Sequence, residues 1–444
     1  MRSTVVTIVG RPNVGKSALF NRIVGKRTAI VEEYSGITRD RLYSTFEYEE
    51  EHFTIVDTGG IEGTGKNELK RKVQEQTNFA ISEADIIFFV VDGNDGVMPF
   101  DEEIANKLHK IQAPVFLIIN KIDNEKRKSF IYEFHKLGFK FQFHISAIHN
   151  LNMSTLLEKT VETARDLRTR ETKVNFCDYP EDIVKLCIVG CPNVGKSSLV
   201  NSLIGEERSI VNDSPGTTRD AIDSTLKYYG MDIVLIDTAG LRKKSKISEK
   251  IERYSVIRTL KAIDRSDIVI FMIDSNKGVT IGDTKIASYI YEAGRGVVVV
   301  FNKWDQIEKD DKTYLKFQEQ VDSKLYFLNN PPVEFISALD QTRIHKILES
   351  AMKVYDCYRI EIQTSKLNKI IEKAQADTPG ERKGSQVFKI FYGTQTGRKP
   401  PIVKLFVNNP DICKPNYKRY LTKRIIKEVG LFGVPLKIYL KSRR

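Results

Sequence analysis

The octapeptide Gly10-Arg11-Pro12-Asn13-Val14-Gly15-Lys16-Ser17 decides the fold, and the sequence contains its pattern twice. The second copy, 180 positions further on, is Gly190-Cys191-Pro192-Asn193-Val194-Gly195-Lys196-Ser197. Each copy matches G-x-x-x-x-G-K-[ST], follows a strand-like apolar run and opens a helix-like one. In that context backbone N–H groups wrap nucleotide phosphates, Lys16 and Lys196 reach the β- and γ-phosphates, and the serine hydroxyl binds Mg²⁺. A β–α turn without a ligand could explain one match, but two matches in this context predict two nucleotide sites.

Four shorter motifs follow each phosphate loop in the same order. They are G-x-T-R-D at 36–40 and 216–220, D-x-x-G at 57–60 and 237–240, N-K-x-D at 120–123 and 302–305, and Ser-Ala at 146–147 and 337–338. Recurrence of a whole ordered set at a nearly constant offset is the signature of an internal repeat. We therefore expect two tandem copies of one domain.

The D-x-x-G and G-x-T-R-D motifs predict a metal-linked switch. A carboxylate at the end of a strand holds Mg²⁺, and the glycine N–H that follows senses the γ-phosphate. The residues concerned are Asp57 with Gly60, and Asp237 with Gly240. A threonine in a loop can bind Mg²⁺ only while the γ-phosphate is present, which orders and releases the loop. We assign this role to Thr38 and Thr218, with Thr217 as an alternative in the second copy.

The N-K-x-D motif predicts specificity for guanine. Its aspartate can accept both the N1–H and the N2–H₂ of guanine, a donor pair that adenine lacks, and the unmatched polar edge disfavours ATP. Its asparagine can bond N7 and tie loops together, its lysine stem can pack over the ring, and the alanine N–H of Ser-Ala can face O6. The residues are Asn120, Lys121, Asp123, Ser146 and Ala147 in the first copy, and Asn302, Lys303, Asp305, Ser337 and Ala338 in the second.

Apolar runs alternate with helical patterns through both copies. In the first copy we expect strands at 4–9, 53–56, 86–91, 115–119 and 141–145, and helices at 18–24 and 154–167. Continuous apolar strands between helices indicate a parallel sheet that is covered on both faces, the α/β class. The motifs then fall at the carboxyl ends of strands, where such sheets bind ligands. We expect domains at 1–167 and 183–356, with a charged connector at 168–182.

The last segment, 357–444, repeats neither copy. It predicts a small α+β domain with a mostly antiparallel sheet, with helices at 366–374 and 417–429 and strands at 387–392, 402–407 and 436–440. From Asp356 onward there are 20 Lys and Arg against seven Asp and Glu, whereas the rest of the chain has 50 against 51. This concentration of basic charge favours a polyanionic partner over a merely solvated face.

Composition sets the remaining expectations. With 444 residues, 41% of them hydrophobic and 29% charged, the chain is typical of a globular protein. Its apolar runs are of strand length, too short to span a membrane, and Met1–Val9 leads straight into the phosphate loop, which leaves no room for a signal peptide. The five cysteines form no C-x-x-C pair, which favours reduced thiols. We expect a cytoplasmic monomer.

These motifs together resemble the bacterial Der (EngA) GTPase family, which has two tandem G domains and a C-terminal KH-like domain. The resemblance covers nearly the whole chain. It rests on the paired P-N-V-G-K-S, G-x-T-R-D, D-T-x-G, N-K-x-D and S-A motifs and, in the tail, on 389–395, Pro400-Pro401, 405–408 and 417–421. It implies GTP hydrolysis at both sites, coupled to maturation of the large ribosomal subunit and hence to ribosomal RNA.

The residue after D-x-x-G departs from the Ras pattern. Ras-like enzymes place a water-orienting glutamine there, but this chain has Ile61 and Leu241, so each domain alone should hydrolyse GTP slowly. Similarity to potassium-activated relatives implies that Asn13 and Asn193 are K⁺ ligands; local hydrogen bonding within the loop is the alternative. Whether Arg39 and Arg219 act in catalysis or brace the switch stays open.

The tail departs from the usual KH pattern as well. A KH domain grips RNA with a G-x-x-G loop between two helices, but the only such string here, Gly430–Gly433, lies between a helix and the last strand. We interpret it as a helix C-cap and turn. RNA contacts would instead come from basic side chains along one helix, with a solvated helix face as the alternative: Lys418, Arg419, Lys423, Arg424 and Lys427.

Two other functions stay in view. A tRNA-modifying, potassium-dependent GTPase is disfavoured by the two phosphate loops and by the lack of a cysteine motif near the C-terminus. A nucleotide-gated RNA-binding scaffold, in which turnover is incidental, is left partly open by Ile61 and Leu241.

Overall fold

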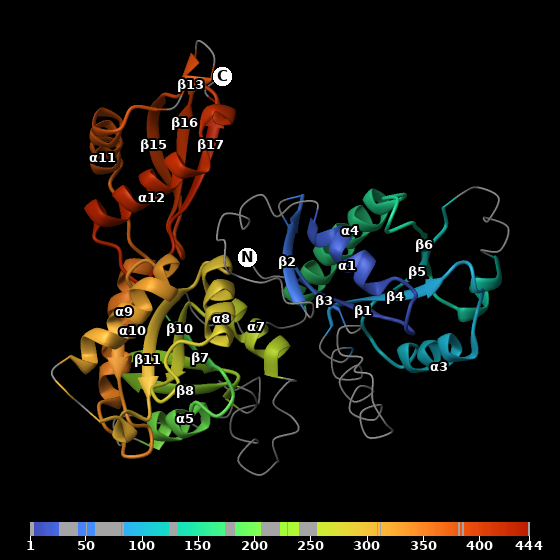
Figure 1. Cartoon of the computed structure of the whole chain (residues 1–444), viewed down its shortest axis with the longest axis horizontal. Helices are drawn as coiled ribbons and strands as arrows, with labels where there is room; N and C mark the ends of the chain where they lie inside the picture. The colour runs from blue at the N-terminus through green and yellow to red at the C-terminus, as the bar shows by residue number, and fades with distance from the viewer. Residues whose placement is uncertain are drawn as a thin grey trace. The chain divides into compact units, whose positions relative to one another are not determined.

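The structure is a computed structural model and describes residues 4–25, 43–49, 51–57, 81, 84–123, 132–173, 183–205, 223–228, 230–238, 255–308, 310, 312–380, 382–383 and 386–442. These residues form two compact units (Figure 1). The first contains the described residues up to 173, with 255–258, and the second contains the rest.

The first unit is a six-stranded sheet with helices on both faces. Its elements are β1 (Thr4–Val9), α1 (Lys16–Gly25), β2 (Tyr43–Tyr48), β3 (Glu51–Asp57), β4 (Ile86–Asp92), α3 (Pro99–Leu108), β5 (Val115–Asn120), β6 (Phe141–His144) and α4 (Met153–Lys173). The strand order is β2-β3-β1-β4-β5-β6, and only β2 runs antiparallel to its neighbour.

The core of this unit lies in two apolar layers, one on each side of the sheet. Phe88 and Val90 of β4 pack with α1 and α4, while Phe89 and Val91 pack with α3. Side chains alternate sides along a strand, so a strand that is buried on both faces must be apolar throughout. All seven residues of β4 are indeed buried, which confirms the α/β prediction.

The chain from 183 to 358 repeats this architecture. Its elements are β7 (Val184–Gly190), α5 (Lys196–Gly205), β8 (Ser224–Tyr228), β9 (Met231–Ile236), α7 (Ser255–Arg265), β10 (Ile268–Asp274), α8 (Ile281–Glu292), β11 (Gly296–Asn302), η5 (Trp304–Gln306), α9 (Thr313–Lys324), η6 (Tyr326–Leu328), β12 (Val333–Phe335) and α10 (Ile344–Tyr358). The strand order β8-β9-β7-β10-β11-β12 is that of the first sheet, strand for strand.

The C-terminal segment forms a three-stranded sheet with two helices on one side. Its elements are α11 (Thr364–Asp377), β13 (Arg382–Lys383), β14 (Gln386–Val387), β15 (Ile390–Gly397), β16 (Ile402–Val407), η7 (Pro410–Ile412), α12 (Pro415–Val429) and β17 (Lys437–Ser442). β15 and β16 are antiparallel, but β16 and β17 are parallel. The prediction of a mostly antiparallel sheet is therefore wrong for the second pair, because the chain crosses back through α12 between them.

The C-terminal segment and the second repeat share one continuous hydrophobic core. Backbone hydrogen bonds join them as well: Val297 N donates to Gly433 O at 2.8 Å, and Gly433 N donates to Asn329 O at 2.9 Å. Lys399 N of the C-terminal segment also donates to Tyr358 O, at the end of α10, at 3.1 Å. These two parts of the chain therefore stabilise each other as a single cooperative unit. In the described part of the chain, no helix has the length and apolar character needed to cross a membrane.

Several element bounds differ from those expected. Helix α4 continues to Lys173, six residues into the expected connector, because its charged last turns keep helix-forming residues to the end. β2 was not foreseen, since Tyr43–Tyr48 mixes polar and aromatic residues on an edge strand. Gly430 caps α12 in the left-handed region at φ 85°, as interpreted from the sequence.

Candidate nucleotide-binding sites

Each phosphate loop leaves the central strand of its sheet. β1 lies between β3 and β4, the point at which the strand order changes direction, and such points bind ligands at the strands' carboxyl ends. Gly15 has φ +94°, and a Cβ there would lie 2.3 Å from the Asn120 Nδ2 atom. The same holds for Gly195 and Asn302 at φ +95° and 2.3 Å. Only glycine fits at these positions, because a side chain would be strained and would displace the asparagine.

The loop lysine is held inside the loop it follows. Lys16 is 4% exposed, and its ammonium donates to Gly10 O and Arg11 O at 2.8 Å each. Lys196 donates to Gly190 O at 3.0 Å and Cys191 O at 2.7 Å. Two backbone carbonyl groups therefore hold each cation against its phosphate loop, from where it can neutralise phosphate oxygens.

The residues assigned to Mg²⁺ lie together in the first site. The Ser17 hydroxyl donates to Asp57 Oδ2 at 3.0 Å. A hydroxyl and a carboxylate side by side supply the oxygen ligands that Mg²⁺ prefers, so the residues present fit that ion. In the second site Ser197 lies in the first turn of α5, while Asp237 follows β9 and its N–H donates to Asp223 Oδ1 at 2.9 Å. The remaining residues of this assignment, Thr38, Gly60, Thr217, Thr218 and Gly240, lie outside the described residues.

The N-K-x-D asparagines tie the base-side loops to the phosphate loops. Asn120 Nδ2 donates to Val14 O at 2.9 Å, and its Oδ1 accepts from Ala147 N at 3.1 Å. Asn302 makes the same pair of bonds, to Val194 O at 2.7 Å and from Ala338 N at 2.9 Å. The alanine N–H, which we expected to face guanine O6, thus has a protein partner in the structure.

The aspartates predicted to recognise the base differ between the two sites in their contact with the neighbouring serine. Ser146 Oγ donates to Asp123 Oδ1 at 2.8 Å, which leaves the second carboxylate oxygen for a ligand. In the second site, Ser337 Oγ donates to Asp340 Oδ2 at 3.2 Å instead. Asp305 lies in the short helix η5 beside Trp304 and is exposed. The serine of the second site therefore bonds to a different carboxylate from its counterpart in the first site.

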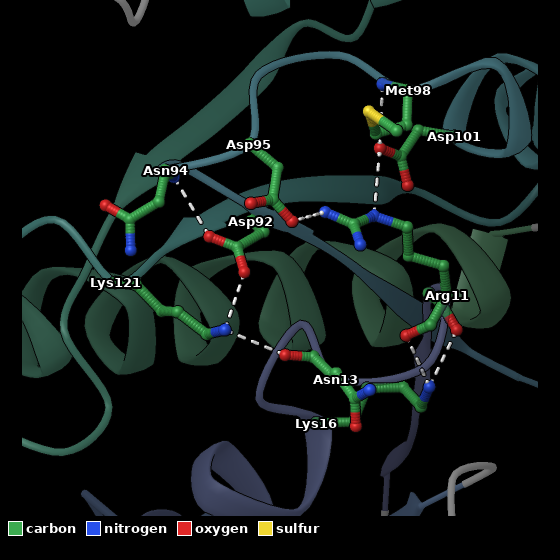
Figure 2. A network of polar contacts seen from close by, with 10 residues as sticks. Arg11, Asn13, Lys16, Asp92, Asn94, Asp95, Met98, Asp101 and Lys121 are labelled. Carbon is green, nitrogen blue, oxygen red and sulfur yellow. Dashed lines mark hydrogen bonds and ion pairs between the residues drawn. The ribbon is translucent and has the colours of Figure 1, made fainter.

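Sequence reasoning missed an ion pair at the end of β4. Lys121 Nζ lies 2.6 Å from Asp92 Oδ2 and donates to Asn13 O at 2.8 Å, so one cation joins two loops (Figure 2). Lys303 and Asp274 repeat the pair at 2.6 Å. Burial acts to raise the pKa of Asp274, but hydrogen bonds from Lys303 and the Asn276 N–H outweigh it, so the pKa lies below its usual value. The signal was available, because each aspartate ends a long apolar strand.

Arg11 makes a second missed network in the first site. Its guanidinium lies 2.6 Å from Asp95 Oδ2 and 3.5 Å from Asp101 Oδ2, and Met98 N also donates to Asp101 (Figure 2). Burial raises the pKa of Asp101, and the Met98 N–H and the Arg11 charge oppose that shift. Burial acts to lower the pKa of Arg11, but the hydrogen bond to Asp95 and the nearby carboxylates raise it above its usual value.

The second site replaces this arginine by Cys191. The counterpart of Asp101 is the buried Asp283, which caps α8 by accepting from Thr280 N at 3.0 Å and Thr280 Oγ1 at 2.6 Å. Burial, and then the nearby Asp283 carboxylate, raise the pKa of the Cys191 thiol to about 12. The two phosphate loops are therefore anchored by different chemistry although their backbones correspond.

The predicted K⁺ ligands Asn13 and Asn193 have left-handed backbones, at φ 67° and 61°, and both are exposed. The exposed loop prolines Pro12 and Pro192 precede them. In this conformation each asparagine side chain lies at the rim of its phosphate loop, accessible to solvent.

The five basic residues predicted to touch RNA all lie on α12, but they are not equivalent. Lys423 and Lys427 are exposed, and Arg419 is half-buried. Lys418 is half-buried too, and burial lowers its pKa. Arg424 pairs with Asp377 at 2.9 Å. Lys423 and Lys427 are thus the two whose charges are most accessible to a partner.

Comparisons with known proteins agree with this architecture. The family described as 50S ribosome-binding GTPase matches residues 5–121 and 185–303, and the one described as KH-domain-like of EngA bacterial GTPase enzymes, C-terminal, matches 361–441. GTPase Der of Geobacillus sp. strain WCH70 is 46% identical over all of this chain and all of its own. GTPase Der of Caldanaerobacter subterraneus is 46% identical over all of this chain and 99% of its own. A solved structure of Aquifex aeolicus Era bound to GDP·AlF4⁻ is 20% identical, covers 59% of this chain and 94% of its own, and has a TM-score of 0.29. Because relatives match it from end to end and both family models fall on the expected segments, the chain belongs to the Der family of bacterial GTPases, with two G domains and a KH-like domain.

Proposed function

We propose that this GTPase acts as a nucleotide-switched factor in assembly of the large ribosomal subunit. One observation carries the proposal: the second nucleotide site is built into a unit whose core continues into the basic C-terminal domain. That domain holds the basic excess of the chain, and ribosomal RNA of a subunit precursor is a polyanion of matching chemistry. The description of the matched family, a 50S ribosome-binding GTPase, supports this partner.

The reaction would be in-line attack of water on the γ-phosphate of GTP, which releases GDP and phosphate. Lys16 and Lys196, fixed inside their loops, would neutralise the phosphate charge that develops in the transition state. Ser17 with Asp57, and Ser197 with Asp237, would hold Mg²⁺, together with Thr38 and Thr218. That ion would offset the negative charge of the phosphate oxygens. The water-orienting group is not supplied by Ile61 or Leu241, which lie outside the described residues.

Potassium is the proposed substitute for an arginine finger. Asn13 and Asn193 would supply side-chain oxygens to K⁺ from the exposed rim of each loop, a position that their left-handed backbones allow. Replacing K⁺ by Na⁺ at constant ionic strength should slow turnover, and Asn13→Asp with Asn193→Asp should change that cation preference. Equal turnover in the two salts would remove K⁺ from the proposal.

Strand β11 offers a route from nucleotide to the C-terminal domain. Its last residue, Asn302, is part of N-K-x-D, and at its start Val297 N is bonded to Gly433 O. A seven-residue strand is about 23 Å long and stiff along its axis. Contacts that differ between the GTP and GDP states at Asn302 can therefore bias the packing of the C-terminal domain, which is what a switch requires.

The test is co-sedimentation of the full chain with purified large ribosomal subunits in Mg²⁺ and K⁺. Binding with a non-hydrolysable GTP analogue and not with GDP supports the proposal, provided that Lys423→Glu with Lys427→Glu weakens it. Lys346→Glu with Lys353→Glu, on the exposed side of α10, is the matched control. Binding indifferent to nucleotide would leave a constitutive RNA binder. Deleting 357–444 is unsuitable, because it would open the shared core.

Base specificity is tested separately. Asp123→Asn and Asp305→Asn should each move one site from guanine toward xanthine nucleotides, because the amide donates where the carboxylate accepted. Unchanged GTP affinity in both variants would refute the N-K-x-D assignment. A variant that cannot turn over GTP but still supports assembly would favour the scaffold alternative.

A further inference from the structure

The sheet of the C-terminal domain has one covered face and one open face. α11 packs on β15, and α12 packs on α11 and β17, all on the same side (Figure 1). The side chains that point to these helices are buried and apolar: Ile390, Val403, Leu405, Val407 and Ile438. Alternate residues of the same strands must point the other way, to the open face.

The open face carries aromatic rings and lysines in two rows across the strands. The first row joins Tyr392, Phe406 and Lys441, and the second joins Lys404 and Tyr439. Tyr392 and Phe406 are stacked, with ring centroids 4.3 Å apart and planes 15° from parallel. Tyr392 is 41% exposed and Tyr439 is 50% exposed. Each row therefore combines a flat apolar surface with a cation.

The charge of this face has one sign. β16 and β17 contain lysines, and none of the strands β15, β16 and β17 contains Asp or Glu. Next to this face, the exposed Lys389 lies 5.9 Å from the centroid of the Phe391 ring, which is itself 40% exposed. A surface with cations and exposed rings but no anion favours a polyanion that has flat apolar groups. It disfavours a protein partner whose surface carries charges of both signs.

We propose that this open face, made by Tyr392, Lys404, Phe406, Tyr439 and Lys441, binds single-stranded RNA. Unpaired bases stack on the rings, and the lysines contact the phosphates between them. Duplex RNA does not fit, because its bases are stacked on each other and its deep groove excludes side chains. The two tyrosines lie on the outer strands, β15 and β17, one row apart. The spacing between strands and the rise along them place the two residues about 12 Å apart. That distance suits two or three bases. This inference rests on the proposed function only in taking RNA as the partner, and it places the base contacts on the sheet rather than on α12.

The experiment measures fluorescence anisotropy of a labelled ten-nucleotide uridine RNA with the full-length protein in GDP. Tyr392→Leu with Tyr439→Leu should weaken binding at least tenfold, because each lost stack costs about 1–3 kcal/mol, or about five- to 150-fold. Tyr314→Leu with Tyr326→Leu is the matched control, since these tyrosines of the second G domain are 51% and 54% exposed. The control pair should leave binding unchanged. A ten-base-pair RNA duplex should bind the wild type more weakly than the single strand.

The lysines give a second, independent measurement. Lys404→Gln with Lys441→Gln should lower the slope of log affinity against log salt by about 1.4, for two phosphate contacts with a single strand. Variants that lose binding must keep the wild-type circular dichroism spectrum and GTP turnover, which shows that they fold.

Three results would overturn the inference: no binding of the oligomer by the wild type, equal loss in the control pair, or loss only with Lys423→Gln and Lys427→Gln on α12. None of them would decide the ribosomal proposal, which co-sedimentation tests with whole subunits.

Discussion

Replacing Arg11 by alanine should destabilise the first unit by about 2–3 kcal/mol. The Asp95 contact is worth about 0.5 kcal/mol, because that carboxylate is 50% exposed and water screens the pair. Asp101 is fully buried, and removing one partner of a buried pair costs about 3–5 kcal/mol. We expect about 2 kcal/mol for this contact, since the charges are 3.5 Å apart and Arg11 is 16% exposed.

The chain offers an internal reference for measuring this effect. Its one tryptophan, Trp304, packs on Phe317 and Phe335 in the second unit, so its fluorescence follows the unfolding of that unit alone. Urea unfolding should be followed by both far-ultraviolet circular dichroism and Trp304 fluorescence. With a denaturant slope of about 2 kcal/mol/M, Arg11→Ala should lower the midpoint of the dichroism transition of the first unit by about 1 M. The Trp304 midpoint should not move.

The effect should also depend on pH. Arg11 opposes the upward shift of the Asp101 pKa, so its loss raises that pKa further. A raised carboxyl pKa in the folded state means that stability is lost as pH rises, because the ionised form is the disfavoured one. The difference between Arg11→Ala and wild type should therefore be largest at pH 8 and shrink toward pH 5. A first-unit midpoint that does not move, or a Trp304 midpoint that moves equally, would refute the assignment. So would a shift just as large when Asp101 is already asparagine.

Three further outcomes follow from the second site. Gly195→Ala should weaken GDP binding there at least tenfold, because it adds about 1–2 kcal/mol of backbone strain and a 2.3 Å clash with Asn302. Titration with a fluorescent GDP analogue measures the affinity of both sites, and the unchanged first site is an internal control. Undiminished affinity of the second site would contradict the loop geometry. Acid should destabilise the second unit below about pH 4, because Asp274 has a lowered pKa in the folded state. The stability that this gives is present above the usual carboxyl pKa and is lost as pH falls through the folded-state pKa. Trp304 fluorescence measures the loss, and Asp274→Asn should not show it. Cys191, with its pKa raised to about 12, should at pH 8 carry about a thousandfold less thiolate than a free cysteine. After treatment with iodoacetamide, mass spectrometry should therefore find Cys191 of the folded protein unmodified long after the unfolded chain has reacted. Equal rates of modification would show that the thiol is not shielded.

The sequence predicts the G domains well because their determinants are local. A strand that is buried on both faces must be apolar from end to end, so the sequence predicts β4. A glycine with a positive φ that lies close to another residue cannot be replaced, so the motif pattern predicts Gly15. Position along the chain then places the motifs at one edge of the sheet. β2 escaped because an edge strand with one covered face needs no such run.

The missed features of the site depend on pairs that are far apart in the chain. Arg11 and Asp101 are 90 positions apart, and the sequence around either residue does not indicate that the other is its partner. The direction of β17 likewise depended on where α12 packs, which is a property of the finished core. Local propensity carries no information on such choices, because they are settled by packing among distant segments.

The bond from Val297 to Gly433 has a consequence for biosynthesis. Translation delivers the chain in order, so the sheet of the first unit can form once the residues up to 173 have emerged. Strand β11, by contrast, emerges more than a hundred residues before the segment that completes its hydrogen bonding and covers the neighbouring apolar core. We expect the nascent second G domain to stay incompletely ordered through that interval. Chaperones can then bind the apolar surface that the C-terminal segment will later cover. A chain cut short before Gly433 would lack this hydrogen bond and the part of the shared core that the C-terminal segment supplies.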